Sequence, residues 1–233
     1  MPRFLRRSSL LFAAPLCLLF ASAGYAQLTP ADKVTPIADA RKLPPGTSVK
    51  VYGVVSTPSG AFESSFYDKG FGLQDAGAGI YISTQTLFNI AKPPKRAYVT
   101  GVLKDQSGLL AVVPAADTAV QFPIGFAYNA ADAAVIAPRP LKTADVGEAN
   151  EGLIVQVSGK ITRAPTSDAP YGFKFSVDDG SGEALIFVNV QTGIAMSSLA
   201  AGQAVSVTGF SSQYDTHHEI DPRSPADIVA AKP

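Results

Sequence analysis

The sequence predicts an all-β protein made of two tandem five-stranded barrels that follow an N-terminal signal peptide. Three observations predict it. The chain opens with a short apolar run behind a basic start. The remainder alternates polar and apolar residues between turns rich in Gly, Pro and Asp, which is typical of short β-strands. A set of short motifs then recurs in the same order later in the chain, which indicates a duplicated unit.

Residues 1–26 have the three parts of a secretory signal peptide: a basic start, an apolar run of signal length and a stretch of small residues. We expect cleavage after Ala26, with cleavage after Ala23 as the alternative. General secretion is the favoured route, although the pair Arg6-Arg7 leaves twin-arginine export as an alternative. The mature protein is therefore expected in the periplasm or outside the cell, with no membrane span.

Removal of the signal peptide changes the composition in two ways. The only cysteine, Cys17, is lost, so the mature chain has no disulfide, thiolate metal site or cysteine nucleophile. Three arginines are also lost, which leaves 16 Lys and Arg against 19 Asp and Glu and a net charge of about −3. A strongly basic nucleic-acid-binding domain is therefore excluded.

Two copies of one strand pattern align along the mature chain, about 106 residues apart. The matching segments are VKVYGVV at 49–55 with VQVSGKI at 155–161, IYI at 80–82 with IFV at 186–188, and YVTG at 98–101 with SVTG at 206–209. We place the two domains at residues 34–122 and 140–233. The connector, residues 123–139, contains an alanine-rich part that predicts a short helix at Ala130–Ala134.

Each copy holds about five strands, the first of them long and with a glycine near its middle. A glycine inside a strand marks a bulge or tight bend, which a small closed barrel needs. We expect a short helix between the third and fourth strands, at residues 85–91 and 193–199. Three strands, a helix and two strands follow one another in the OB-fold, so each copy is predicted to be an OB-fold-like barrel.

Period-two alternation predicts the side chains that fill each barrel. They are Val49, Val51, Ile80, Ile82 and Val99 in the first copy, and Val155, Val157, Ile186, Val188 and Val207 in the second.

These motifs resemble bacterial secreted OB-fold modules, similar to the OB-like domains that accompany extracellular nucleases and phosphoesterases. The likeness rests on the Val-x-Val-x-Gly-x-Val strand, FGLQD at 71–75, GAGIYI at 77–82 and the final Val-x-Gly, and it covers both copies. The resemblance implies the fold and a binding role beside an enzyme. No nuclease domain is attached to this chain.

Two aromatic residues are expected on the outer face of the third strands. Tyr81 and Phe187 each lie between two residues that face inward, so alternation places their rings outside the barrel. Rings on that face can stack on bases or sugar rings. The alternative for both is a cross-strand pair or a contact with the other copy.

OB-folds commonly recognise ligands with the loop after the first strand and the loop before the last. The candidate binding residues in these regions are Tyr67, Lys69, Lys104, Tyr171 and Lys174. The alternative is that the aromatic residues close the barrel end, which we favour for Phe62 and Phe66.

The first copy has a net charge of about +2 and the second about −5. Lys92, Lys95 and Arg96 form the one basic cluster in the sequence, and such a cluster is usually a solvated turn. An anionic polymer is therefore expected on the first copy, if on either.

No metal or catalytic constellation is predicted. The residue types at 215–221, with His217, His218 and three carboxyl groups, are those of metal ligands. Adjacent histidines on a strand point to opposite faces and do not share an ion easily, although in a loop they could. We interpret residues 215–221 as a polar hairpin before the last strand. Asp178 and Asp179 have the residue types of a turn. The sequence contains no Gly-x-Ser-x-Gly elbow, no His-Glu-x-x-His and no phosphate-binding glycine loop. We predict a protein with no enzymatic activity and no cofactor.

The sequence therefore predicts an exported tandem OB-fold binding protein. Its expected ligand is a single-stranded nucleic acid or an oligosaccharide. The alternative is a structural or adaptor protein that uses its barrels to contact other proteins of the cell envelope.

Overall fold

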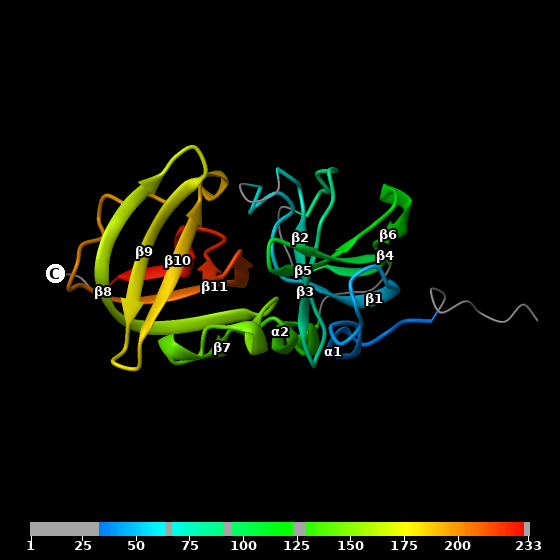
Figure 1. Cartoon of the computed structure of the whole chain (residues 1–233), viewed down its shortest axis with the longest axis horizontal. Coiled ribbons are helices and arrows are strands. Elements are labelled where there is room, and N and C mark those ends of the chain that lie inside the picture. The colour runs from blue at the N-terminus through cyan, green and yellow to red at the C-terminus, as the bar shows by residue number, and fades with distance from the viewer. Residues whose placement is uncertain (1–32, 64–66, 91–94, 124–128, 231–233) are drawn as a thin grey trace, which may run out of the picture.

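The all-β fold class is confirmed in a computed structural model, which describes residues 33–63, 67–90, 95–123 and 129–230 (Figure 1). The predicted signal peptide, Phe66 and Lys92 lie outside the described residues. Within them, the only α-helices are α1 (Ile37–Ala40) and α2 (Ala130–Val135). Two sheets lie side by side along the long axis of the molecule.

The first sheet has the strand order β1-β2-β3-β5-β4-β6, and a further pairing of β1 with β4 closes it. β3 and β5 are parallel, and the other pairs are antiparallel. The strands are β1 (Ser48–Val55), β2 (Phe71–Gln74), β3 (Gly79–Ile82), β4 (Arg96–Gln106), β5 (Leu109–Val113) and β6 (Val120–Gln121).

The second sheet has the order β13-β11-β12-β10-β9-β8-β7 and is closed by β11 with β8. β10 runs parallel to β12. The strands are β7 (Arg139–Pro140), β8 (Ile154–Asp168), β9 (Gly172–Asp178), β10 (Glu183–Asn189), β11 (Ala204–Tyr214), β12 (His217–Asp221) and β13 (Ile228–Ala230). The five strands of each closed ring therefore follow the same path, with the fifth strand parallel to the third.

Short 3₁₀ turns join or follow these strands. They are η2 (Asp117–Ala119), η3 (Thr143–Asp145), η4 (Glu148–Asn150), η5 (Val190–Thr192) and η6 (Pro225–Asp227). The predicted connector helix is confirmed as α2, where the Asn129 side chain caps the first turn and Asp132 completes a capping box. None of the helices in the described part of the chain has the length and apolarity needed to cross a bilayer.

The glycine in each first strand has the predicted role. A Cβ on Gly53 would collide with the backbone carbonyl of Gln74 on β2, and one on Gly159 would collide with that of Asp178 on β9. At this point the long strand passes from one neighbour to the other, because β1 pairs with both β2 and β4 and β8 pairs with both β9 and β11. Only glycine lets the backbones approach this closely.

The predicted core is confirmed, since all ten valine and isoleucine side chains named from the alternation are at most 1% exposed. The helices expected between the third and fourth strands are wrong. Phe88 and Ile90 pack into the first core, and Ile194 and Met196 pack against the second. Apolar residues two positions apart suit an extended segment, which places both side chains on the same side, and not a helix. The 3₁₀ turn η5 ends at Gly193, which has left-handed backbone geometry.

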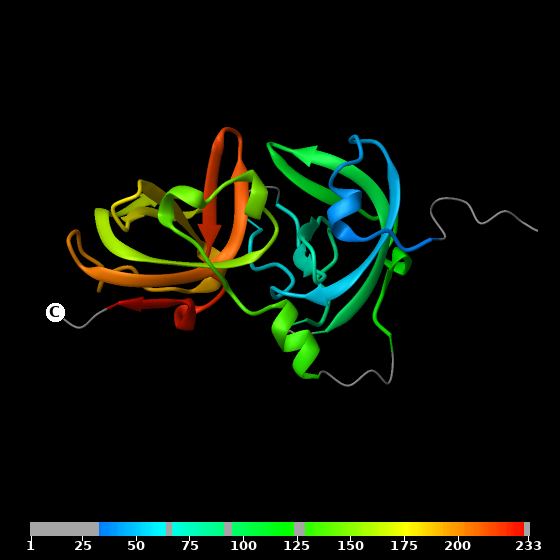
Figure 2. The ribbon, with the colours of Figure 1, turned by 90° about the horizontal axis from the view of Figure 1, so that it is seen from below.

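The two barrels share a small apolar cluster of their own. Its buried members are Ala61, Phe62, Tyr81, Leu109, Ala111, Ile154 and Phe210. The Gln74 side chain accepts a hydrogen bond from the Ile154 backbone N–H at 2.8 Å. At the other edge, the β4–β5 and β11–β12 hairpins meet at their tips through a bridge between Gly108 and Tyr214 (Figure 2). The Phe62 ring therefore closes the end of the first barrel where it meets the second, as favoured above, and does not face a ligand.

Candidate ligand-binding site

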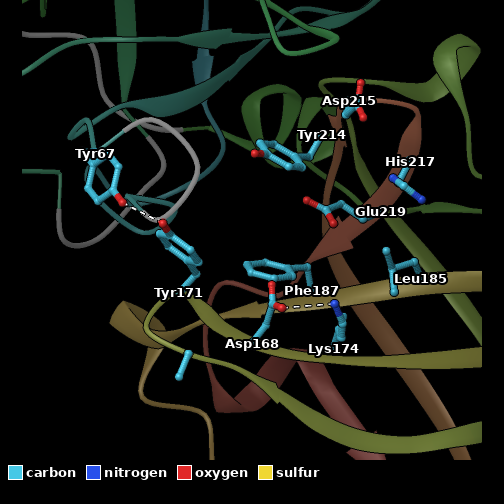
Figure 3. Close-up of a pocket in the computed structure, with 11 residues that line it drawn as sticks. Tyr67, Asp168, Tyr171, Lys174, Leu185, Phe187, Tyr214, Asp215, His217 and Glu219 are labelled. Carbon is cyan, nitrogen blue, oxygen red and sulfur yellow. Dashed lines mark hydrogen bonds and ion pairs between the residues drawn. The ribbon is translucent and has the colours of Figure 1, made fainter.

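A pocket of about 640 Å³ lies on the second barrel, on the face of β9 and β10. The β8–β9 turn borders it on one side and the β11–β12 hairpin on another, and one residue of the first barrel, Tyr67, reaches its mouth (Figure 3). The lining residues are Tyr67, Asp168, Ala169, Tyr171, Lys174, Leu185, Phe187, Tyr214, Asp215, His217 and Glu219.

Strand alternation explains how these side chains reach the pocket. Ile186 and Val188 of β10 fill the barrel core, so Phe187 between them faces outward. On β12 the core residue is Ile220, and its neighbour Glu219 faces the pocket. Leu185 on β10 is the parallel-pair partner of Glu219, which brings both strands into one wall.

Aromatic rings form much of the lining. The hydroxyl groups of Tyr67 and Tyr171 are hydrogen-bonded to each other at 2.9 Å, and the two rings meet edge to face. Tyr67 is 65% exposed and Tyr214 is 50% exposed, so their rings are open to solvent. Phe187 is 9% exposed and forms the inner part of the wall. Open rings beside a deeper one are suited to holding a flat-faced ligand.

The charged groups of the pocket are mostly acidic. Lys174 pairs with Asp168 at 3.1 Å, so its charge is already compensated. Asp215 and Glu219 add two more carboxyl groups. Burial, together with the nearby Asp168, raises the pKa of Glu219 to about 8, and Lys174 opposes the change. Phosphate groups would therefore meet more carboxyl groups than cations here.

Behind Glu219 on the same strand lies a second buried acid, Asp221. Burial and the neighbouring Glu219 hold the pKa of Asp221 well above its ordinary value. Both residues belong to the outward face of β12, because Ile220 between them points into the core.

The structure brings four of the seven predicted binding residues together. Tyr67, Tyr171, Lys174 and Phe187 all line the pocket, although Tyr67 comes from the other copy. Sequence reasoning missed Glu219, because residues 215–221 were interpreted as a polar hairpin. The signal was present: the Glu-Ile-Asp order of residues 219–221 alternates like a strand with one polar face.

The expectation that Tyr81 offers a stacking surface is wrong. Its side chain does leave the barrel core, but the second barrel covers it, and Tyr81 is 1% exposed. The ring lies 5.9 Å from the Phe210 ring, and the hydroxyl donates to Asp68 at 2.7 Å. Burial and Asp68 raise the Tyr81 pKa well above its ordinary value, and burial raises that of Asp68.

The two other predicted lysines do not line the pocket. Lys69 forms an ion pair with Glu63 in the loop between β1 and β2. Lys104 is exposed on strand β4, opposite Ala111, and not in a loop before the last strand as expected. Tyr81, Lys69 and Lys104 therefore do not form one surface: the first is covered by the second barrel, the second is paired and the third lies on strand β4.

The basic cluster is structural in its described part. Lys95 donates to the backbone carbonyl of Asn89, and Arg96 forms an ion pair with Asp132 of α2 at 2.7 Å. Arg96 therefore ties the connector helix to the first barrel.

The polar loops behave as turns. Asp178 accepts hydrogen bonds from the backbone N–H groups of Gly180 and Gly182, which confirms the turn. Hydrogen bonds from Ser181 and Thr143 lower the pKa of Asp179. Among the described residues, no group of three His, Cys, Asp or Glu side chains is arranged to hold a metal ion.

Comparison with known proteins assigns no family. No protein-family model matches the sequence, and no curated protein matches it. Among solved structures, a murine DNA-binding protein bound to double-stranded DNA is 13% identical with a TM-score of 0.43, and covers 79% of this chain and 97% of its own. The p204 HINb domain is 11% identical with a TM-score of 0.38, over 80% and 96% of the two chains.

A deletion mutant of the single-stranded DNA-binding protein from Thermus aquaticus is 12% identical, with a TM-score of 0.26 over 81% of this chain and 95% of that one. What this chain binds has to follow from its own site.

Proposed function

We propose that this chain is an exported, non-enzymatic binding protein that holds an oligosaccharide in the aromatic pocket of its second barrel. The observation that carries the proposal is the place of the pocket in the fold. It lies on the face of the second and third barrel strands, β9 and β10, between the turn after β8 and the hairpin before β12. OB-folds bind oligonucleotides and oligosaccharides with that face and those two loops.

The lining suits a sugar chain. The volume of about 640 Å³ falls within the roughly 300–1,000 Å³ of pockets that enclose small ligands. Phe187, Tyr171 and Tyr214 offer ring faces for the apolar side of a sugar. Carboxyl oxygens and the Lys174 ammonium supply acceptors and donors for its hydroxyl groups.

Single-stranded nucleic acid fits the same rings but not the same charges. Affinity for nucleic acids comes mainly from cations that neutralise phosphates. In this pocket Asp168, Asp215 and Glu219 outnumber the one lysine, and that lysine is paired. The observations therefore favour the oligosaccharide over the nucleic acid.

A binding role is also favoured over hydrolysis. Glycosidases use two carboxyl groups on opposite sides of the scissile bond, one as acid and one as nucleophile or base. Glu219 is a suitable acid, because burial raises its pKa to about 8. Asp168, however, is held in an ion pair with Lys174, which occupies the second carboxylate.

Export is supported by residues 1–26, whose basic start, apolar run and small residues are those of a signal peptide. We predict that the mature protein begins at Gln27. N-terminal analysis of material from the periplasm and medium tests this, and a chain that keeps Met1 there would overturn the export.

The test of the ligand is a direct binding measurement on the mature protein. Neutral oligosaccharides are identified on a glycan array and then titrated by calorimetry, beside a single-stranded DNA of similar length at low and high salt. We expect saturable sugar binding that changes little with salt. Phe187→Ala should weaken it by about tenfold, or about 1.4 kcal/mol.

The matched control is Tyr98→Ala, because Tyr98 stacks on Tyr52 on the first barrel, outside the pocket. It should leave sugar binding unchanged. Salt-dependent DNA binding without sugar binding would replace the oligosaccharide by nucleic acid. Binding of neither polymer would leave the adaptor alternative, in which the barrels contact envelope proteins.

A further inference from the structure

The inner wall of the pocket contains a buried acid with no partner. Glu219 is 5% exposed. In Figure 3 its carboxyl group points into the space between the rings of Tyr214 and Phe187. No hydrogen bond or ion pair of the Glu219 side chain occurs within the described residues. A buried carboxyl group without a partner is costly in its charged form, and a ligand that supplies the partner removes that cost.

Charged or titratable groups surround Glu219 from β8, β9 and the β11–β12 hairpin, whereas β10 contributes Leu185 and Phe187. Asp168 at the end of β8 and Lys174 on β9 form a pair at 3.1 Å. Asp215 and His217 come from the β11–β12 hairpin. Asp221 lies farther along β12. Carboxyl groups outnumber the cations in this set, so a cationic ligand finds more groups that can pair with it than an anionic ligand does.

The aromatic rings of the pocket also favour a positively charged ligand. The face of an aromatic ring is electron-rich and attracts cations, most strongly where water is excluded. Phe187 and Tyr214 flank the Glu219 carboxyl group in the close-up. A cation at this place would meet ring faces on its sides and a carboxylate at its end. A neutral hydroxyl group would gain much less from the same surroundings.

We propose that the pocket selects an amino sugar, whose protonated amine lies against Glu219 while the sugar ring packs on Phe187 and Tyr214. This inference rests on the proposed oligosaccharide binding and names the class of sugar. On binding, Glu219 gives its proton to the solvent, and its carboxylate forms the ion pair with the ligand ammonium. The pKa of about 8 in the free protein means that this proton is present below neutral pH.

The experiment compares three oligosaccharides of equal length by titration calorimetry at about pH 6, where the ligand amine carries its charge. They are a β-1,4-linked tetramer of glucosamine, the corresponding N-acetylglucosamine tetramer and cellotetraose. We expect the glucosamine tetramer to bind at least about tenfold more tightly than the other two. Titration in two buffers of different ionisation enthalpy should show the release of a proton for the glucosamine tetramer only.

The deciding variant is Glu219→Gln, which keeps the shape of the protonated acid and removes its charge. It should abolish both the preference for the amine and the proton release. The matched control is Glu183→Gln, since Glu183 pairs with Arg163 outside the pocket. This control should keep the preference and the proton release. Circular dichroism establishes that both variants are folded.

The outcomes separate the two proposals. Binding of none of the three sugars overturns the proposed function. Equal binding of all three, or tighter binding of the N-acetylated or hydroxyl form, keeps the proposed function and overturns the amino-sugar inference. A lysine tetrapeptide is included as a second source of amines. Tighter binding of the peptide than of the glucosamine tetramer would also overturn the inference, in favour of a basic protein segment.

Discussion

The two barrels have the same strand path, yet the outer face of the third strand is buried in the first barrel and open in the second. In the first barrel, the third-strand residue Tyr81 leaves the core and is covered by Phe210 of the second barrel. In the second barrel, the corresponding residue Phe187 lines an open pocket. In the first barrel this face forms the interface with the second barrel around Phe62, Tyr81 and Phe210, which we call the joint. Its counterpart on the second barrel remains open to a ligand. Duplication therefore does not imply two equivalent binding sites.

The joint itself explains the asymmetry. Gly79 and Gly152 approach so closely that a Cβ on either would collide with the backbone of the other. Arg41 of the first barrel forms ion pairs with Glu148 and Glu151 at 2.8 and 3.1 Å. Such contacts hold the two barrels against each other at these residues. Among the described residues of the first barrel, Tyr67 alone lines the pocket of the second.

The largest expected effect comes from breaking the joint. Phe210 is fully buried and packs against both Phe62 and Tyr81. Phe210→Ala should lower the free energy of unfolding by about 5 kcal/mol, at the upper end of the cost of such a cavity. Urea unfolding measures it. Phe187→Ala is the matched change on the open face, and it should cost clearly less; equal losses would contradict the distinction between joint and open face.

A second prediction concerns pH. The folded pKa of Glu219, about 8, lies above its ordinary value of 4.5. The folded protein therefore binds a proton that the unfolded chain loses, so this contribution to stability is present below about pH 4.5 and is lost as pH rises to about 8. At about 1.4 kcal/mol per pH unit, the loss is on the order of 5 kcal/mol.

Unfolding in urea at several pH values between 4 and 9 measures this loss. Glu219→Gln should make the profile less steep and raise the stability at the alkaline end, because the variant has no charge to bury at residue 219. The buried Asp221, whose pKa is also raised, contributes to the slope that remains. A wild-type profile that stays flat, or a variant as pH-sensitive as the wild type, would show that Glu219 is solvated and that the pocket is wetter than its geometry indicates.

The sequence was sufficient for features that depend on neighbouring residues along the chain. Period-two alternation identified Val51, Ile82 and their counterparts as core, and it placed Tyr81 and Phe187 outside their barrels. It could not show what lies against each outer face. Coverage of Tyr81 depends on Phe210, which is 129 positions away in a different barrel. No local pattern contains that information.

The missed residues have a similar explanation. Glu219 and Tyr214 lie in a hairpin whose polar composition suits solvent. They become pocket residues because β12 pairs in parallel with β10, a contact that depends on closing the whole barrel. The net charge of each copy favoured the first copy as the place for an anionic polymer. Net charge carries no information about how the barrels pack, and the aromatic pocket lies on the acidic second copy.

A third prediction compares hydroxyl groups at the two faces. Tyr81→Phe removes the donor to Asp68 inside the joint, and leaves the buried carboxyl group with Ser83 and the Gly70 N–H. We expect a loss of about 2 kcal/mol in unfolding free energy, the usual cost of removing a hydrogen bond to a buried charged acceptor. Thermal and urea unfolding measure it. An unchanged stability would indicate that water reaches Asp68 and that the joint is looser than described.

The smallest effect is expected for the same substitution at the mouth of the pocket. Tyr67→Phe removes the hydroxyl that bonds to Tyr171 at 2.9 Å, a contact between the barrels that borders the ligand site. Tyr67 is 65% exposed, so water replaces the lost partner, and the unfolding free energy should change by less than about 0.5 kcal/mol. The ring stays in place, so sugar affinity measured by calorimetry should change by less than about threefold. A loss of stability as large as that of Tyr81→Phe would make the mouth part of the joint, and the second barrel would then have no open face.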